Sequence, residues 1–340
     1  MAGPDLSSSE RREVLKMFIF QFSKLKDLFL SPLTPSLRDV LGSIRRYPLW
    51  GTWGQEKIVV FEVDGSGFHG GLCDRFKGIV SLYAFCKAIH RPFRIHYIFP
   101  FDLQDYFLPG VYDWRLRTEE LSCNFLNSRL LRIIGDANIN RLLKESRTNR
   151  QLHVNANRDI VALINERFGT KFSWSSLWSE LFIPCDFLQK QMKTYREQIG
   201  SEYIGVAFRF QNIFGDYPEY DLQPLSISRQ NDLAEWGLSC LSKIQRRENL
   251  PLLVTSDSTR FLALMDNRKG IFPLKGKGAH EDTIKGASFA TYGKSILDLL
   301  MLSKAKKIYS PAIDEMYVSG FPETAAKIGN IPLERILSRW

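Results

Sequence analysis

Residues 57–99 hold the pattern that most constrains the fold of this chain. The apolar run over 57–63 predicts a buried strand, and a loop over 64–71 with four glycines follows it. A helix is predicted over 74–89, and a second strand over 94–99. A strand, a helix and a strand in this order form a βαβ unit, so the N-terminal half is predicted to be α/β with a parallel sheet.

The second half of the chain repeats this alternation. Strands are predicted over 203–208, 252–255, 271–272 and 307–309, and helices over 232–247, 259–265, 295–305 and 321–328. Between the halves, the pattern predicts helices over 126–134 and 159–168, a buried helical layer from Trp174 and a polar helix over 185–198. We therefore predict two Rossmann-like α/β domains that face a cleft. They cover residues 51–199 and 200–340, after a leader and helix over 1–50.

The charge of the chain favours an anionic partner. Its 340 residues carry a net charge of +9, but the basic residues are scattered and are not interleaved with aromatic ones. This distribution favours a nucleotide over nucleic acid. The five widely spaced cysteines lack metal-ligand spacing, which predicts reduced thiols, no metal and a cytoplasmic location. Residues 15–30 predict an amphipathic helix rather than a membrane span, and peripheral membrane association stays open.

Arg209 is the first candidate for a functional residue. It directly follows the predicted strand over 203–208, and Gly215-Asp216 follows in turn. Open α/β sheets bind ligands at the carboxyl ends of their strands, and the planar guanidinium can hold two phosphate oxygens at once. The alternative is a surface pair between Arg209 and Asp216.

The glycine-rich loop is the second candidate. It matches neither the dinucleotide nor the P-loop pattern, but Gly70 and Gly71 would let a ligand approach the backbone at a helix start, unless they only form a turn. His69 is a candidate for proton transfer or a plain loop histidine. Asp74 and Arg75 either contact the ligand or complement the helix dipole and pair locally.

Two polar groups in the second half complete the candidates. Ser256, Asp257 and Ser258 follow a strand, where they would contact a nucleotide, although one of them could cap the next helix. Ser295 and Asp298 lie one turn apart on an apolar helix. A carboxylate there needs a partner, so ordering of a loop or a basic side chain is the leading reading for Asp298, with substrate contact the second.

The order of these motifs resembles the fucosyltransferase-like group of GT-B glycosyltransferases. That group includes bacterial α-1,2- and rhizobial α-1,6-fucosyltransferases and protein O-fucosyltransferases. The resemblance covers residues 57–330 as spaced motifs: Gly70 to Phe76, Phe208 to Phe210 with Gly215-Asp216, Thr255 to Ser258, Ser295 to Asp298, and Ser319 to Phe321 with Ala325-Ala326. There are two departures, Ala207 where the family often has histidine and Cys73-Asp74 in place of a Gly-Asn pair.

The resemblance implies a metal-independent, inverting transfer of fucose from GDP-fucose to a glycan acceptor. It implies that Arg209 holds the β-phosphate and that Asp257 and Ser258 contact the nucleotide. The loop at Gly70 and Gly71 would close the donor site, and Arg75, Ser295 and Asp298 join the expected donor contacts. His69 or Asp74 would be the acceptor base.

Two other functions stay open at this point. The departures at Ala207 and Cys73 are also what a catalytically silent glycan- or nucleotide-binding protein of the same fold would show. A transferase that uses another nucleotide sugar would differ only in details of the pocket.

Overall fold

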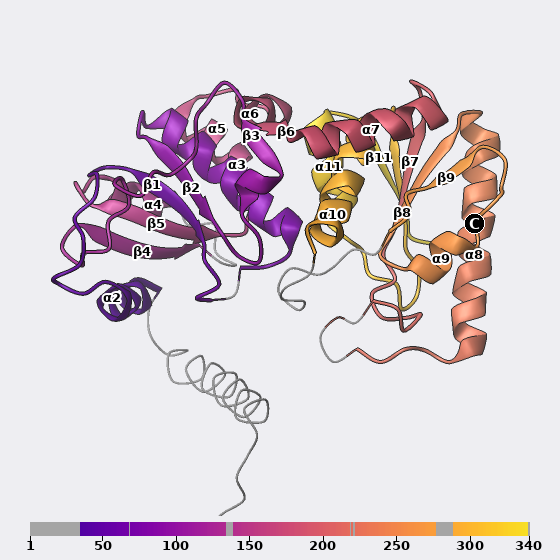
Figure 1. Cartoon of the computed structure of the whole chain (residues 1–340), viewed down its shortest axis with the longest axis horizontal. Coiled ribbons are helices and arrows are strands. Elements are labelled where there is room, and N and C mark those ends of the chain that lie inside the picture. The colour runs from indigo at the N-terminus through magenta and orange to yellow at the C-terminus, as the bar shows by residue number, and fades with distance from the viewer. Residues whose placement is uncertain are drawn as a thin grey trace, which may run out of the picture.

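The computed structural model describes residues 35–67, 69–133, 139–217, 219, 222–276 and 288–338. The predicted leader and the predicted helix over 15–30 lie outside these ranges. The described chain forms two lobes side by side, each built around its own sheet (Figure 1). Parallel sheets, with helices packed on them, confirm the predicted α/β class.

The N-terminal lobe contains a four-stranded parallel sheet in the order β2-β1-β5-β4. Its strands are β1 (Val59–Val63), β2 (Phe93–Tyr97), β4 (Ser128–Ile133) and β5 (Gln151–Ala156). Helices α3 (Leu72–Ala88), α5 (Val161–Phe168) and α6 (Trp174–Leu181) pack together on one side, and α2 (Pro35–Arg46) packs on β4. Smaller elements are η1 (Leu103–Asp105), β3 (Phe107–Pro109), α4 (Ile139–Ser146) and β6 (Phe182–Pro184).

One prediction in this lobe is wrong. The stretch over 126–134, predicted as a helix, contains strand β4, and the following strand β5 was not predicted. Leu131 and Ile133 join the core shared with α3, while Leu130 is buried on the α2 side, where its Cδ2 would lie 3.2 Å from a Cβ at Gly42. A strand buried on both faces loses the alternation that distinguishes it from a helix.

The C-terminal lobe contains a five-stranded parallel sheet in the order β11-β10-β7-β8-β9. Its strands are β7 (Ile204–Phe208), β8 (Leu252–Ser256), β9 (Ile271–Pro273), β10 (Ile308–Pro311) and β11 (Leu333–Ile336). Helix α8 (Ile227–Glu248) covers one face, and α10 (Phe289–Leu302) and α11 (Phe321–Gly329) cover the face toward the N-terminal lobe (Figure 1). The short α9 (Thr259–Ala263) follows β8.

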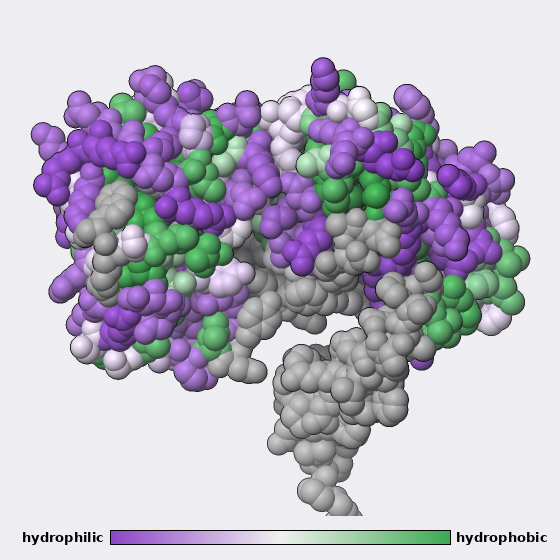
Figure 2. All heavy atoms as spheres, turned by 180° about the vertical axis from the view of Figure 1, so that it is seen from behind, coloured by the Kyte–Doolittle hydropathy of each residue, from purple (hydrophilic) through white to green (hydrophobic). Residues whose placement is uncertain are grey.

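The two lobes share one apolar core. Tyr106 stacks on Phe289 of α10 with ring centres 4.6 Å apart, and its hydroxyl donates to the carbonyl of Phe289 over 2.7 Å. Helix α7 (Asp186–Ile199) packs on α10 although it precedes the predicted division at residue 200, so the domain boundaries stay a prediction. Seen from behind, hydrophilic side chains cover most of both lobes (Figure 2). Within the described ranges, none of the helices is both long and apolar enough to cross a membrane.

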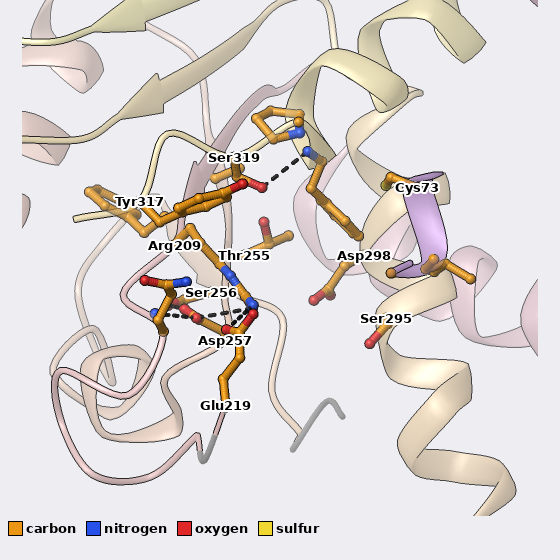
Figure 3. A pocket seen from close by; sticks show the side chains of 18 of the residues that line it. Cys73, Arg209, Glu219, Thr255, Ser256, Asp257, Ser295, Asp298, Tyr317 and Ser319 are labelled. Atoms are coloured by element: carbon orange, nitrogen blue, oxygen red, sulfur yellow. Dashed lines mark hydrogen bonds and ion pairs between the residues drawn. The ribbon is translucent and has the colours of Figure 1, made fainter. Parts of the chain in front are cut away.

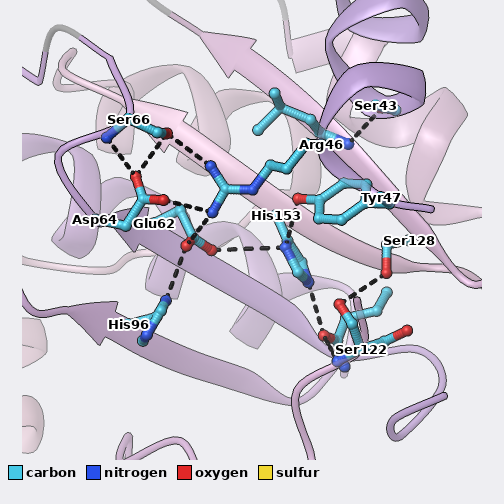
Figure 4. Close-up of polar contacts among 12 residues, drawn as sticks. Ser43, Arg46, Tyr47, Glu62, Asp64, Ser66, His96, Ser122, Ser128 and His153 are labelled. Atoms are coloured by element: carbon cyan, nitrogen blue, oxygen red, sulfur yellow. Dashed lines mark hydrogen bonds and ion pairs between the residues drawn. The ribbon is translucent and has the colours of Figure 1, made fainter. Parts of the chain in front are cut away.

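The opposite face of the N-terminal sheet carries a buried polar network, which we call the Arg46 cluster: Arg46, Tyr47, Glu62, Asp64, His96 and His153 (Figure 4). Arg46, the last residue of α2, bonds Glu62 and Asp64, each over 2.7 Å. His96 bonds the same Glu62 over 2.8 Å, which raises the pKa of His96. Burial lowers the pKa of His153 to about 4. The cluster thus joins α2 to the sheet through charged side chains.

Candidate functional site

A cavity of about 370 Å³ lies between the lobes, at the carboxyl ends of β7 and β8 and the first turn of α3. Figure 3 shows Arg209, Asp257 and Glu219 gathered on one side of it, with Cys73, Ser295 and Asp298 on the other. Residues from both lobes and from segments far apart in the sequence therefore line one space. Parallel strands bring their carboxyl ends to the same edge of a sheet, which explains this convergence.

Arg209 lines the cavity but is also ion-paired. Its Nη1 lies 3.1 Å from Asp257 Oδ2, its Nη2 donates to Glu219, and its guanidinium carbon lies 4.8 Å from the ring centre of Tyr217. Burial lowers the pKa of Arg209, but the charges of Asp257 and its other neighbours outweigh burial and raise it overall. The guanidinium therefore stays charged at the cavity wall, and an anionic ligand must compete with two carboxylates for it.

Asp216 is not the partner of Arg209, which corrects the surface-pair alternative. Its carboxylate accepts hydrogen bonds from the hydroxyl of Ser258 over 2.9 Å and from the backbone amide of Arg260 over 2.8 Å. Asp216 thus holds the loop after β7 against the start of α9. The Ser258 hydroxyl also accepts from the amide of Phe261 over 3.0 Å, so Ser258 caps α9 and is fully buried outside the cavity lining.

Asp257 lines the cavity and orders the loop that carries Arg209. Its two carboxylate oxygens accept the backbone amides of Phe210, over 2.9 Å, and Gln211, over 2.6 Å. Burial raises the pKa of Asp257, although the charge of Arg209 acts in the opposite direction. The carboxylate therefore fixes the direction in which Arg209 leaves β7, and a direct nucleotide contact by Asp257 stays a proposal.

The glycine-rich loop brings its backbone to the cavity. Gly70 and Gly71 line it, and Gly70 has φ +77°, a conformation that favours glycine. Asp74, in the first turn of α3, lines the cavity too, 3.1 Å from Lys77 Nζ. Gly71 is the N-cap of α3 and makes no side-chain cap bond, so the positive end of the α3 dipole lies at the cavity wall.

Arg75 and His69 lie outside the lining of this cavity. Arg75 is fully buried, and its guanidinium donates to the carbonyls of Gly70 and Phe99 and to the Tyr97 hydroxyl, each over 2.8 Å. Arg75 therefore holds the glycine-rich loop in place from its buried side.

The ring of His69 is buried, and both of its nitrogens have hydrogen-bond partners. Its Nδ1 lies 2.6 Å from the side-chain amide of Asn155, and its Nε2 accepts the amide of Gly65 over 3.2 Å. Burial lowers the pKa of His69 to about 4, so it is neutral at neutral pH. These contacts favour the loop-histidine reading over proton transfer.

Asp298 and Ser295 line the cavity from α10. The Oδ2 of Asp298 accepts from Lys294, which confirms the expected pairing with a basic side chain. Its Oδ1 is buried, and none of the residues that the structure describes donates a hydrogen bond to it. Burial raises the pKa of Asp298 to about 6, while Lys294 acts in the opposite direction. A carboxylate oxygen without a donor is unfavourable, and a ligand N–H or O–H could bond it if the side chain turns it toward the cavity.

Several lining residues were not among the predicted site residues: Lys77, Ala207, Gln211, Tyr217, Glu219, Thr255, Tyr317, Ser319 and Gly320. Ser256 was among the nucleotide-contact candidates, and the structure places it rather than Ser258 at the cavity. Tyr317 to Gly320 follow β10, as Arg209 follows β7, so strand ends were the signal that could have found them. No group of three histidine, cysteine or acidic side chains in the described ranges is placed to hold a metal ion.

Comparison with known proteins identifies the fold. No family model matches this sequence, and neither does any curated protein. Among solved structures, an Arabidopsis thaliana FUT1 variant in complex with GDP is similar, with TM-score 0.54, 15% identity, and 93% of this chain and 78% of that one covered.

Two further structures are less similar. NodZ α-1,6-fucosyltransferase soaked with GDP-fucose has TM-score 0.46 and 11% identity, and the match covers 81% of this chain and 93% of that one. POFUT1 in complex with GDP-fucose has TM-score 0.40 and 10% identity, and the match covers 84% of this chain and 98% of that one.

Proposed function

We propose that the chain transfers fucose from GDP-fucose to a glycan hydroxyl, with inversion and without a metal. It has the fucosyltransferase-like GT-B fold, in which two α/β lobes meet at a cleft. One observation carries the proposal: Arg209 lines the cavity between the lobes, at the end of a strand of the second sheet. The GDP and GDP-fucose in the similar structures belong to those proteins, and they suggest the donor to test here.

In the proposed reaction the acceptor oxygen forms a bond to the anomeric carbon of fucose. The bond from that carbon to the β-phosphate oxygen breaks, and its electron pair leaves with GDP. Arg209 and the positive end of the α3 dipole stabilise the charge that builds on the β-phosphate. Asp74, which is partly exposed in the cavity, takes the proton of the acceptor hydroxyl.

The nucleoside would lie toward α10 in this proposal. Asp298 Oδ1 would accept an N–H or O–H of the nucleoside, and Ser295 one turn earlier would add a hydroxyl. A diphosphate bound at Nη2 of Arg209 would displace Glu219, because Glu219 accepts a hydrogen bond from that nitrogen. Arg75 and Ser258 act only on the loops that carry the lining residues.

Calorimetric titration with GDP, GDP-fucose and UDP, with and without a chelator, tests the donor. We expect GDP and GDP-fucose to bind with the chelator present, and Arg209→Ala to abolish binding. The matched control is Arg115→Ala, because Arg115 is an exposed arginine paired only with Asp113 in a salt bridge. If no guanine nucleotide binds the unmodified protein, the proposal is wrong.

A second candidate is a binding protein without transferase activity. It is favoured by the pairing of Arg209 with both Asp257 and Glu219 and by the absence of an imidazole at Ala207. Release of GDP from GDP-fucose in the presence of a panel of glycans separates the two. Nucleotide binding that depends on Arg209, with no release above the rate in water, would support the binding protein.

A further inference from the structure

A second groove between the lobes lies beside the cavity. It measures about 600 Å³ and is bordered by α5 and α6 of the N-terminal lobe and by α11 of the C-terminal lobe. Phe172 and Trp174 line it together with Asn157, Asp159 and Lys327. Neither the predicted site nor the proposed donor contacts use these residues.

Lys77 connects the groove to the cavity, because it lines both. Its Nζ lies 3.1 Å from Asp74 Oδ1 on the cavity side. Gly320 opposite it has no side chain, and a Cβ there would lie 3.1 Å from the Lys77 Nζ. A chain that follows the groove therefore passes Lys77 and reaches Asp74.

The lining of the groove combines aromatic rings with a fixed set of polar groups. Asp159 Oδ2 accepts Trp174 Nε1 over 2.9 Å and Lys327 Nζ over 2.8 Å, so residues from both lobes hold one another in place. Arg158 is exposed at the edge of the groove. Sugar rings present apolar C–H faces to aromatic rings and hydroxyls to amide, carboxylate and cationic groups, so this mixture suits a carbohydrate.

A third groove, under α7, is less suited to this role. It measures about 750 Å³ and shares none of its lining residues with the cavity. Its lining is largely apolar, with Trp178, Phe182, Ile183 and Met192. This groove therefore lacks the direct connection to the cavity that Lys77 gives the groove beside α11.

We propose that the groove beside Lys77 binds the non-reacting sugar residues of an oligosaccharide acceptor, with its reacting hydroxyl held near Asp74. This inference rests on the proposed function for the identity of the reaction. Binding in the groove positions the hydroxyl next to the base and the donor carbon before the reaction starts. The groove therefore predicts a preference for chains over single sugars.

The test uses the full chain and a panel of gluco-, galacto-, xylo- and chito-oligosaccharides, each as mono-, di-, tetra- and hexasaccharide. Binding is measured by calorimetry without donor, and GDP release is measured with GDP-fucose. We expect affinity to rise with chain length for at least one series. Arg158→Ala and Phe172→Ala should each raise the Kd and the KM of the longest chain about tenfold, with kcat and GDP affinity unchanged.

Lys193→Ala is the matched control, because Lys193 is an exposed cation that lines the groove under α7. Thermal unfolding identifies any loss of folding in Phe172→Ala, and Arg158→Ala at an exposed position keeps the test valid in that case. The inference is overturned if no oligosaccharide binds, if neither variant weakens binding, or if Lys193→Ala weakens it equally. Glycan binding that depends on Arg158, without any guanine nucleotide binding, would retain the groove and reject the proposed transferase.

Discussion

Two arginines in this chain each pair with one aspartate and one glutamate, but they lie in very different surroundings. Arg46 lies between Glu62 and Asp64, and Arg209 lies between Asp257 and Glu219. In both cases burial lowers the arginine pKa and nearby carboxylates outweigh it. Arg46 ends a helix packed on the sheet, whereas Arg209 follows a strand that points at the other lobe. Topology, rather than pairing, thus places Arg209 and not Arg46 at the wall of the cavity.

The largest expected effect comes from exchanging the two arginines for alanine. Arg209→Ala should weaken GDP binding at least about 100-fold, because charge-assisted bonds to phosphate are lost. Arg46→Ala should leave GDP binding unchanged but lower the free energy of unfolding by roughly 3 kcal/mol, because it leaves buried carboxylates without their cation. Calorimetry and urea unfolding of both variants measure this. If both variants lose GDP binding equally, the distinction between the two arginines is wrong.

The second prediction concerns Asp298 and pH. Burial raises its pKa to about 6, so below that pH the carboxyl is protonated and Oδ1 no longer accepts a ligand hydrogen bond as an anion. GDP affinity should fall about tenfold between about pH 7 and about pH 5. Lys294, Tyr195 and Ser295 surround the group.

Asp298→Asn is the variant that checks this pH dependence. The amide does not titrate, so its GDP affinity should be low and nearly constant across the same range. Ser295→Ala, one turn earlier in the same wall, keeps the carboxylate and should retain the slope. A pH slope that persists in Asp298→Asn would assign the titration to another group.

The third prediction concerns the carboxylate that competes for Arg209. Glu219→Gln removes a charge that faces the guanidinium, so GDP and GDP-fucose should bind about fivefold more tightly. Asp257→Asn should have the opposite effect, because Asp257 also holds the amides of Phe210 and Gln211 in place. Calorimetric Kd values decide it, and weaker binding by Glu219→Gln would show that Glu219 positions Arg209 instead.

The last prediction concerns the buried histidines. Burial lowers the pKa of His69 and of His153 to about 4. Below the ordinary histidine pKa of about 6.5, these two side chains therefore bind protons in the unfolded chain but not in the folded chain. Stability should therefore fall as the pH falls from about 6.5 toward 4, by at most about 1.4 kcal/mol per pH unit for each histidine. Glu62 raises the pKa of His96, so protonation of His96 stabilises the folded chain as the pH falls and offsets part of this loss.

His153→Gln should remove part of this slope in urea unfolding measured across the same pH range. The control is His90→Asn, because His90 is exposed and has φ +52°, a conformation that asparagine tolerates. An unchanged slope in His153→Gln would show that its ring is not held neutral within the Arg46 cluster.

Sequence patterns predicted the strands that carry the site better than the strands between them. The apolar run at β7 identified a strand end that borders the cavity, and the run at β1 located the glycine-rich loop that leads to it. Strand β4 was mistaken for a helix, because both of its faces are buried. Arg209, Asp74 and Asp298 were expected at the site, and all three line the cavity. Their roles in binding and catalysis stay proposals.

The sequence by itself determined the α/β class, the glycine-rich start of α3 and an arginine at a strand end, because each depends on local periodicity or on one residue type. Only the tertiary structure decided which polar residues share a space. Asp257 and Ser258 are neighbours in the chain, yet one faces the cavity and the other caps a helix. Glu219 reaches Arg209 from a loop that no periodic pattern describes. Such contacts depend on how the loops that follow the strands fold against one another, which local sequence does not encode.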